Sequence, residues 1–560
     1  MAASGAPQGT DWWREAVVYQ VYPRSFQDTN SDGIGDLQGI IDRLDYLNDG
    51  SERSLGIDGI WLSPTFPSPM KDFGYDVSDY CGVHPDFGDM ETMDRLISEC
   101  HRRGIRLLLD FVPNHSSEMH PWFLESRSSR TSPKRDWYIW RDARPDGGLP
   151  NNWQAIFGGP AWEWDEATGQ YYLHSFLVEQ PDLNWRNPEV VAAMHDVLRF
   201  WIDRGIDGFR IDVMGMVVKH PELLDNPLNP AWQTGDPWRW QYLWANNQNY
   251  PDVFDAVRGI RAVLDEYPGR MAVGEVFGSA AEIAAYYGGE KLDGLQLAFD
   301  FHFIHERYPL YTPWEAPRLH GIAHRAETAL PEGAQPCWAF NNHDRPRFPS
   351  RQNAAGHGQE RARAAPLVLL ALRGTPFLYY GEEIGMEDVR IPGDRLQDPA
   401  RFHEAGRDPE RTPMQWDATG GRGFSAAEPW LPFGPRQINV AAQDTAPDSL
   451  LSLYRRAIWR RKQEPSLLRG RCTLLPDDDY VFAFLREADG ARTVLVAVNT
   501  DAVDRRLPLP PGEWVVLVAS SLAMEQTPAS SRLVLPPFAA AWLVPAGPAA
   551  GGAASVILDA

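Results

Sequence analysis

The sequence predicts a parallel (β/α)8 barrel of the TIM type, with a loop-rich domain inserted after its third strand and a C-terminal antiparallel β-sandwich. Three observations predict it. Eight short apolar segments, mostly separated by amphipathic helical stretches, are typical of parallel strands joined by helical crossovers. Residues 116–186 are rich in Trp, Pro, Gly, Asn and charge, with little periodicity. Beyond about residue 470, short alternating segments and turns replace the helical pattern.

The unit at residues 187–213 shows how each strand is expected to follow its helix. Asn187 can cap a helix and Pro188 suits its first position, and apolar residues then recur at helical spacing. Gly205 suits the C-terminal stop, and a strand follows at 208–213. Residues 89–112 repeat the plan. The expected barrel strands are 17–22, 59–62, 105–112, 208–213, 271–276, 294–299, 337–341 and 375–379.

The two stretches that break this pattern set the domain boundaries. We expect the barrel in two parts, residues 1–115 and 187–470. The inserted B domain then occupies 116–186, and the C-terminal β domain occupies 471–560.

Composition and charge exclude several classes of function. The net charge of −23 argues against nucleic acid and acidic membrane surfaces as partners, but not against neutral ligands. The absence of an 18-residue apolar run, and of a signal peptide in MAASGAPQGT, predicts a soluble cytoplasmic protein. The four cysteines form no CxxC pair, so neither a zinc site nor a disulfide framework is expected. The 22 Trp suit core packing and also the stacking of sugar faces. The oligomeric state stays open.

The stretch GFRIDV, residues 208–213, places two full charges inside an apolar run. Strand side chains alternate between faces, so Arg210 and Asp212 share a face opposite Phe209, Ile211 and Val213. Buried charges are costly unless they are paired, so the polar face is expected to serve a site.

Polar clusters also end other expected strands, at the barrel face where TIM-barrel active sites lie. Taken alone, each cluster is better explained as polar side chains at the barrel mouth whose hydrogen bonds are made within the protein. Their convergence on one rim predicts an active site. The clusters are Asp110, Asn114 and His115 in LLLDFVPNH, Arg210 and Asp212 in GFRIDV, Glu275 in MAVGEVF, and His343 and Asp344 in CWAFNNHD.

Two of these carboxyls are expected to differ in pKa. Arg210 should lower the pKa of Asp212 and keep it ionised, as a nucleophile requires. The apolar neighbours of Glu275 should raise its pKa, so that it stays protonated as a general acid. Glycoside hydrolysis needs such a pair of carboxyls.

These motifs resemble a known family. DFVPNH, GFRIDV, GEVF and NNHD, in this order, match the four short conserved regions of the α-amylase superfamily of glycoside hydrolases. QPDLNW, residues 180–185, resembles the fifth region of its α-glucosidase and oligo-1,6-glucosidase branch. VVYQVYPRSFQDTNSDGIGDL and RTPMQW also resemble that branch, and the likeness runs from about residue 11 to 545.

The resemblance implies a role for each matching residue. Asp212 is the nucleophile, Glu275 the general acid and base, and Asp344 the third carboxylate, which holds sugar hydroxyls. The implied substrate-binding residues are Asp72, Tyr75, His115, Phe157, Arg210, His343 and Arg411, with Arg411 beside Asp72 closing the pocket.

The motif DTNSDGIGD, residues 28–36, resembles an oxygen cage for Ca²⁺. Its ligands would be Asp28, Asn30, Asp32, the Ile34 carbonyl and Asp36. Position twelve is Gly rather than Glu, so the loop is not an EF-hand, and an acidic turn is the alternative. The resemblance favours a structural Ca²⁺ and implies no organic cofactor. Asn114, a calcium ligand in many amylases, is expected to be structural here.

The resemblance implies an exo-acting, retaining α-glucosidase that acts on short maltose-like or isomaltose-like oligosaccharides, with some transglycosylation. An isomerising glucosyltransferase, such as a trehalose synthase or sucrose isomerase, shares the same catalytic set and is the alternative. A non-catalytic transporter heavy chain would need a membrane helix, which the sequence lacks. The linkage stays open: Val213 occurs in many oligo-1,6-glucosidases but also in some α-1,4-acting relatives.

Overall fold

The computed structural model describes residues 11–306, 309–402 and 406–547. Its centre is a closed barrel in the order β1-β11-β10-β9-β8-β7-β3-β2, in which every neighbouring pair is parallel. Each expected strand segment overlaps one barrel strand, so the predicted TIM barrel is confirmed. The barrel strands are β1 (Val18–Val21), β2 (Gly59–Leu62), β3 (Arg106–Phe111), β7 (Gly208–Ile211), β8 (Met271–Gly274), β9 (Leu297–Asp300), β10 (Cys337–Ala339) and β11 (Thr375–Tyr379).

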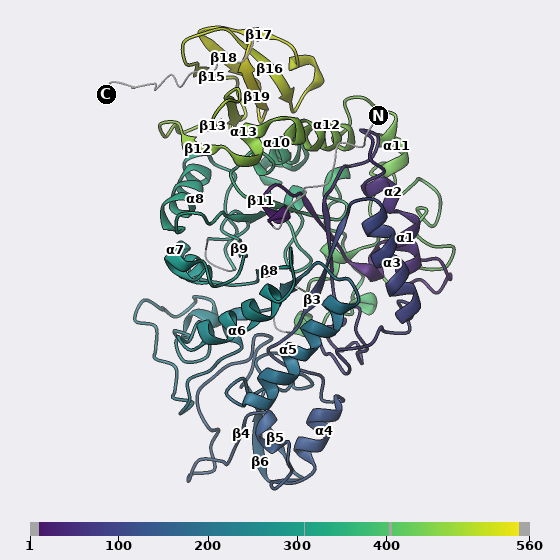
Figure 1. The fold of residues 1–560 in the computed structure, drawn as a ribbon, viewed down its shortest axis with the longest axis vertical. Coiled ribbons are helices and arrows are strands. Elements are labelled where there is room, and N and C mark those ends of the chain that lie inside the picture. Colours follow the sequence, from purple (N-terminus) through teal and green to yellow (C-terminus); the bar gives the residue numbers. More distant parts are fainter. Residues whose placement is uncertain (1–10, 307–308, 403–405, 548–560) are drawn as a thin grey trace.

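Helices surround this barrel (Figure 1). The side chains of Asp89 and Asn187 accept main-chain amides at the starts of α3 (Met90–Arg102) and α5 (Pro188–Asp203), as predicted. Gly104 and Gly205 follow these two helices at φ values of 72° and 108°, which favour glycine. The other longer helices are α6 (Val253–Asp265), α8 (Ala316–Ala329), α10 (Gly358–Leu369) and α12 (Leu450–Gln463), and shorter ones include α1 (Leu37–Asp42), α2 (Leu44–Leu47) and α7 (Ala280–Ala285).

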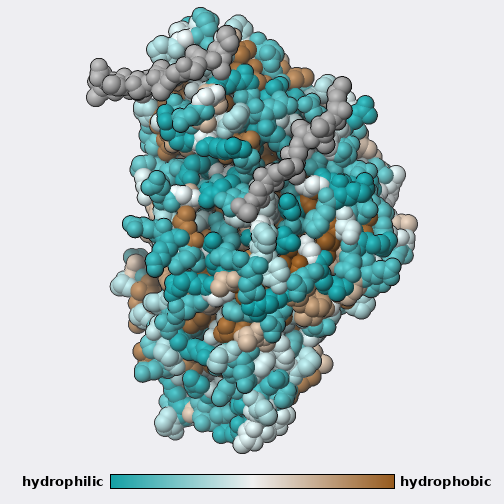
Figure 2. All heavy atoms as spheres, in the orientation of Figure 1, coloured by the Kyte–Doolittle hydropathy of each residue, from teal (hydrophilic) through white to brown (hydrophobic). Residues whose placement is uncertain are grey.

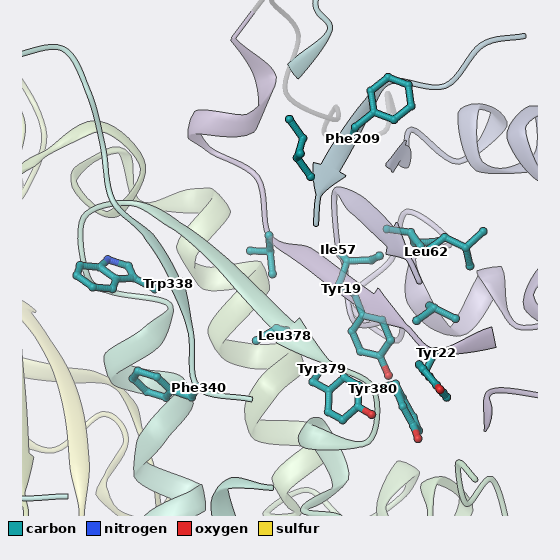
Figure 3. Close-up of a cluster of buried hydrophobic side chains, with 14 of the residues drawn as sticks. Tyr19, Tyr22, Ile57, Leu62, Phe209, Trp338, Phe340, Leu378, Tyr379 and Tyr380 are labelled. Atoms are coloured by element: carbon teal, nitrogen blue, oxygen red, sulfur yellow. The ribbon is translucent and has the colours of Figure 1, made fainter. Parts of the chain in front are cut away.

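Alternation along the strands divides the apolar side chains into two layers. Val18 and Leu108 belong to a cluster inside the barrel, together with Phe299 of β9. Tyr19 and Phe209 belong to the cluster between the strands and the helices, part of which is drawn in Figure 3. The side chains on the inner face near the strand ends are therefore the ones that can reach a common site.

Two additions lie at opposite ends of the molecule (Figure 1). Between β3 and α5, the inserted segment contains α4 (Pro121–Arg127) and an antiparallel sheet of β4 (Trp140–Arg141), β6 (Gln170–Leu173) and β5 (Trp162–Asp165). After the barrel, an antiparallel six-stranded sheet has the order β12-β13-β14-β19-β16-β17, and β15 pairs with β18. These strands are β12 (Arg471–Leu474), β13 (Val481–Glu487), β14 (Val494–Asn499), β15 (Arg505–Pro508), β16 (Trp514–Ala519), β17 (Pro528–Ala529), β18 (Arg532–Leu535) and β19 (Ala540–Pro545).

The molecular surface is polar, as the high net negative charge of the sequence suggests. The face in Figure 2 is mostly hydrophilic, with scattered apolar residues, in keeping with the net charge of −23. In the described part of the chain, every helix is too short or too polar to span a lipid bilayer. The segment MAASGAPQGT, on which the signal-peptide expectation rests, lies outside the described residues.

Candidate active site

The register of three neighbouring strands brings the first charged side chains together. Asp110 of β3 lies opposite Arg210 of β7, and β7 pairs in turn with β8, which leads into Glu275. Strand β7 ends at Ile211, two residues earlier than expected. Val213 then adopts φ 35° and ψ 47°, a left-handed conformation that is unusual for a β-branched residue and typical of functional sites. The turn aims Asp212 and the Val213 amide at the barrel mouth.

One guanidinium joins three carboxylates at this mouth. Nη1 of Arg210 donates to Asp110 at 2.8 Å and to Asp212 at 2.6 Å, and Nη2 donates to Glu275 at 2.7 Å. The main-chain amide of Val213 also donates to Glu275, at 3.1 Å. Asp212 and Glu275 are therefore held on adjacent nitrogens of one side chain, and both line the same cavity.

Because Arg210 binds three acids rather than Asp212 alone, the pKa expected for Asp212 has to be corrected. Burial raises the pKa of Asp212 well above its usual range; Arg210 lowers it, whereas the charges of Glu275 and Asp110 raise it further. Burial likewise raises the pKa of Asp110 to about 6. The expected lowering of the pKa of Asp212 is wrong for the free enzyme, because burial and the charges of Glu275 and Asp110 outweigh Arg210, which also binds those two acids.

A second arginine, not singled out from the sequence, organises the other side of the cavity. Nη2 of Arg407 donates to Asp72 at 2.7 Å, and Nη1 donates to Asp344 at 3.1 Å. Nε and Nη2 of Arg407 also bind Asp398, at 2.9 and 2.8 Å. Burial alone would raise the pKa of Asp344, but His343, Arg407 and Arg411 outweigh it and hold that pKa far below its usual range.

Arg411 was expected to bind beside Asp72 and close the pocket; it makes no contact with Asp72 and acts on that carboxyl only through its charge. Arg411 is fully buried behind the site, where Nε donates to the His343 carbonyl at 2.7 Å and Nη2 donates to Asp344 at 3.0 Å. It does not line the cavity, whereas Arg407 does. Arg411 thus supports Asp344 from outside the pocket, and Arg407 is the partner of Asp72.

The inserted segment contributes a buried amide that links two predicted substrate-binding residues. Nε2 of Gln180 lies 3.1 Å from Oδ2 of Asp72 and 3.1 Å from Nε2 of His115. Burial lowers the pKa of His115 to about 4, so its imidazole is neutral at pH 7. Behind it, Nζ of Lys219 pairs with Asp182 at 2.6 Å and donates to Asn114 at 2.7 Å.

His343 is held in one tautomer. Nε2 of Gln20 donates to its Nδ1 at 2.8 Å, so the ring proton lies on Nε2, which faces the Tyr75 hydroxyl at 2.7 Å. The Tyr75 ring stacks on the imidazole with centroids 5.5 Å apart, and its hydroxyl donates to Asp110 at 3.0 Å. Burial holds the pKa of His343 well below its usual value.

The cavity above these groups has a volume of about 800 Å³. Of the predicted site residues, it is lined by Asp72, Tyr75, His115, Phe157, Asp212, Glu275, His343 and Asp344. The ring of Phe157 lies 5.0 Å from the guanidinium carbon of Arg407. An aromatic segment of the long loop between β7 and α6, which contributes Trp240, Tyr242 and Trp244, also lines the cavity. This segment was not among the residues predicted from the sequence, although its aromatic run WRWQYLW, residues 238–244, is a visible signal there.

The acidic loop at residues 28–36 forms a network of turns. Asp28 accepts main-chain amides of Asn30, Ser31 and Gly33, and Ser425 donates to its second oxygen at 2.5 Å. Asp32 accepts from the Ile34 amide at 2.8 Å, and Asp36 caps α1. Within the described ranges, no group of three or more His, Cys, Asp or Glu side chains is placed to hold a metal ion.

Comparison with known proteins gives a consistent result. Residues 20–470 match the family described as "Alpha amylase, catalytic domain". The chain is 43% identical over 519 residues to a "Probable alpha-glucosidase" of Rhizobium meliloti, covering 89% of this chain and 91% of the relative. It is 40% identical over 546 residues to an "Oligo-1,6-glucosidase" of Heyndrickxia coagulans, covering 91% and 96%.

Solved structures agree. The α-glucosyl transfer enzyme XgtA superposes with a TM-score of 0.87 and 39% identity, covering 95% of this chain and 99% of that one. The trehalulose synthase MutB from Pseudomonas mesoacidophila MX-45 superposes with a TM-score of 0.85 and 34% identity, covering 96% and 100%. With the family match over most of the chain and acidic residues converging at the barrel mouth, the chain belongs to the α-amylase family of glycoside hydrolases.

Proposed function

We propose that this protein is an exo-acting, retaining α-glucosidase that removes terminal α-glucosyl residues from short maltose-like or isomaltose-like oligosaccharides. The observation that supports it most is the pairing of Asp212 and Glu275 on one guanidinium, at the floor of a cavity whose far wall carries Asp72 and Arg407. Retaining glycosidases need two carboxyls close together, at about 5 to 5.5 Å. Curated relatives named α-glucosidase and oligo-1,6-glucosidase support the same reading.

In the proposed reaction, Glu275 donates a proton to the glycosidic oxygen while the Asp212 carboxylate attacks the anomeric carbon. The bond to the leaving sugar breaks, and a β-glucosyl ester forms on Asp212. Glu275, now ionised, takes a proton from water, whose oxygen attacks the same carbon and releases α-glucose. Asp344, kept ionised by Arg407 and Arg411, stabilises the positive charge that develops on the ring.

The remaining polar groups hold the terminal glucose. Asp72 and the neutral imidazoles of His115 and His343 line the cavity beside the catalytic carboxyls and offer hydrogen bonds to sugar hydroxyls. The ion pair between Asp72 and Arg407 blocks extension of a glucan beyond this sugar. A blocked end admits only a chain terminus, which is the reason for the exo action.

A substrate panel tests the proposal. Purified enzyme is incubated with maltose, isomaltose, trehalose, sucrose and maltotriose, and the products are separated by chromatography. Release of α-glucose is the expected result, and the relative rates settle the linkage. Asp212→Asn should fold normally by circular dichroism and lose nearly all turnover of p-nitrophenyl α-glucoside. An active Asp212→Asn variant would refute the covalent mechanism.

An isomerising glucosyltransferase is the second candidate. It is favoured by the likeness to the trehalulose synthase MutB over nearly the whole chain. Such an enzyme would return the glucosyl group to the released sugar rather than to water. Accumulation of an isomeric disaccharide from sucrose or maltose, in place of free glucose, would support this candidate over hydrolysis.

We also propose that the loop at residues 28–36 binds a structural Ca²⁺ through Asp28, Asn30, Asp32, the Ile34 carbonyl and Asp36. The donor chemistry supports it, because all five ligands are oxygens and three are carboxylates of one loop; in the structure these carboxylates do not converge on one point, and the ion would draw them together. Carboxylate oxygens keep further lone pairs after accepting an amide, so the turns and the ion are compatible. The ion would fix the loop and take no part in the reaction.

Cytoplasmic localisation belongs to the same proposal. All four cysteines are free thiols in the structure, which suits a reducing compartment. Cell fractionation with antibody detection tests it, and recovery from the culture medium or periplasm would refute it.

A further inference from the structure

The wall of the catalytic cavity contains one buried acid to which the proposed mechanism gives no role. Glu410 is 2% exposed and lines the cavity together with Asp344 and Tyr311. It lies in the short 3-10 turn Asp408–Arg411. Its main-chain carbonyl accepts the Tyr379 hydroxyl at 3.1 Å, on β11. The main-chain carbonyl of Glu410 therefore bonds to a barrel strand, while its side chain lines the cavity.

The other buried glutamates at this end of the barrel each have their own donors. Glu382 accepts from the Asn341 amide at 2.6 Å and the Tyr454 hydroxyl at 2.8 Å. Glu383 accepts from the Tyr46 hydroxyl at 2.6 Å, and from a second tyrosine hydroxyl at 2.9 Å. The Glu410 carboxyl accepts from its own main-chain amide, and in the described part of the chain no hydrogen bond joins it to another residue. Buried carboxyls usually accept from several donors, so a carboxyl in a cavity wall that only its own amide bonds has capacity left for a ligand.

We propose that Glu410 is a specificity-determining residue that binds a hydroxyl of the leaving sugar. The inference rests on the proposed function and extends it to the second sugar of the substrate. Asp344 and Tyr311 line the same cavity, and both are close enough to Glu410 to interact with it electrostatically; Tyr311 is 40% exposed. Since Asp344 acts on the terminal glucose in the proposed function, a leaving sugar bound beside that glucose in this cavity would lie within reach of Glu410.

The electrostatic surroundings suit this role. Burial and the charge of Asp388 raise the pKa of Glu410 well above its usual value, Arg411 lowers it, and Asp344 raises it again. The raised pKa favours the protonated carboxyl, which can donate to one hydroxyl and accept from another. A neutral sugar hydroxyl requires no charge to balance it.

The test compares substrates whose leaving groups differ. Wild type, Glu410→Ala and Glu410→Asp are assayed for kcat/KM on isomaltose, maltose and p-nitrophenyl α-glucoside. The nitrophenyl group offers no sugar hydroxyls. We expect the ratio of disaccharide to nitrophenyl kcat/KM to fall about three- to tenfold in both variants, the effect of one lost neutral hydrogen bond. Glu410→Gln, which can still donate and accept, should keep most of the ratio.

The matched control is Glu387→Gln, because Glu387 lies nearby, bonds to Gln359 and does not line the cavity. An unchanged ratio in Glu410→Ala and Glu410→Asp, or an equal fall in Glu387→Gln, would overturn the inference while leaving the proposed function intact. A wild-type enzyme that releases glucose from none of the three substrates would overturn the proposed function, and this inference with it.

Discussion

Replacing Arg407 with Met tests the arrangement of the cavity wall, because this side chain joins Asp72, Asp344 and Asp398. In the variant, two of the three acids would still accept a hydrogen bond from another side chain: Asp344 from Arg411 at 3.0 Å, and Asp72 from Gln180 at 3.1 Å. The loss of stability should therefore resemble that of one broken buried pair, about 3–5 kcal/mol, rather than three. Urea unfolding followed by circular dichroism measures it.

The same change should weaken substrate binding through Asp72. Burial already raises the pKa of Asp72 although Arg407 lowers it, so removal of Arg407 favours the protonated acid at pH 7. A hydrogen bond to a charged group contributes about 1.5–3 kcal/mol, which corresponds to a fall of roughly 10- to 150-fold in kcat/KM. The acid limb of the pH profile should also move to higher pH, because only ionised Asp72 makes the stronger, charge-assisted hydrogen bonds to sugar hydroxyls.

A double-mutant cycle separates Arg407 from Arg411. Arg407→Met combined with Asp72→Asn should show a coupling energy of about 0.5–3 kcal/mol in kcat/KM for p-nitrophenyl α-glucoside. Arg411→Met combined with Asp72→Asn should show a smaller coupling energy, since Arg411 binds Asp344 and acts on Asp72 only through its charge. Additive behaviour in the Arg407 cycle would refute the assignment of Arg407 as the partner of Asp72.

Three further perturbations test other parts of the structure. Asp110→Asn removes a charge that raises the pKa of Asp212, so the pH below which kcat/KM falls should decrease; an increase in a pH–rate profile would contradict this. Lys219→Met leaves Asp182 buried without its cation and should lower the free energy of unfolding by about 3–5 kcal/mol; a loss below about 1 kcal/mol in urea titration would be inconsistent with a buried pair. Ca²⁺ at 100 times its Kd should stabilise the wild type by about 2.7 kcal/mol and leave the stability of Asp28→Ala unchanged. Thermal unfolding in EDTA and in Ca²⁺ measures this. A wild-type melting temperature that is the same in both would refute the calcium proposal.

The fold could be predicted because its signals are local. Asp89 and Asn187 are caps whose side chains bond their own first turns, and Gly104 and Gly205 follow their helices in a conformation that favours glycine. Such signals depend on neighbours in the chain. The alternation of side chains along a strand is also local, and it correctly predicted that Arg210 points into the barrel and Phe209 points away from it.

The errors in the site concern contacts between distant segments. Arg407 and Arg411 both belong to GRDPERTPMQW, at the two ends of one short turn, and the sequence does not say which of them faces Asp72. The pKa of Asp212 depends on Asp110, which reaches Arg210 through the register of β3 on β7. The register between strands about 100 residues apart is set by tertiary packing. The motif GFRIDV alone therefore could not indicate that Asp110 also binds the Arg210 guanidinium.

That sharing bears directly on the proposed mechanism. Asp110, Asp212 and Glu275 bring three acidic groups to a single cation, and burial penalises each ionised carboxylate. A fully ionised trio would leave two negative charges unbalanced and would lack the proton that Glu275 must donate. One proton among the three leaves a net charge of −1, with one acid able to donate and one carboxylate able to attack. The charge on Asp344 is held separately by Arg407 and Arg411, so it persists while the proton moves. Dividing the cations in this way lets the site exchange one proton during catalysis without losing the negative charge that the transition state requires.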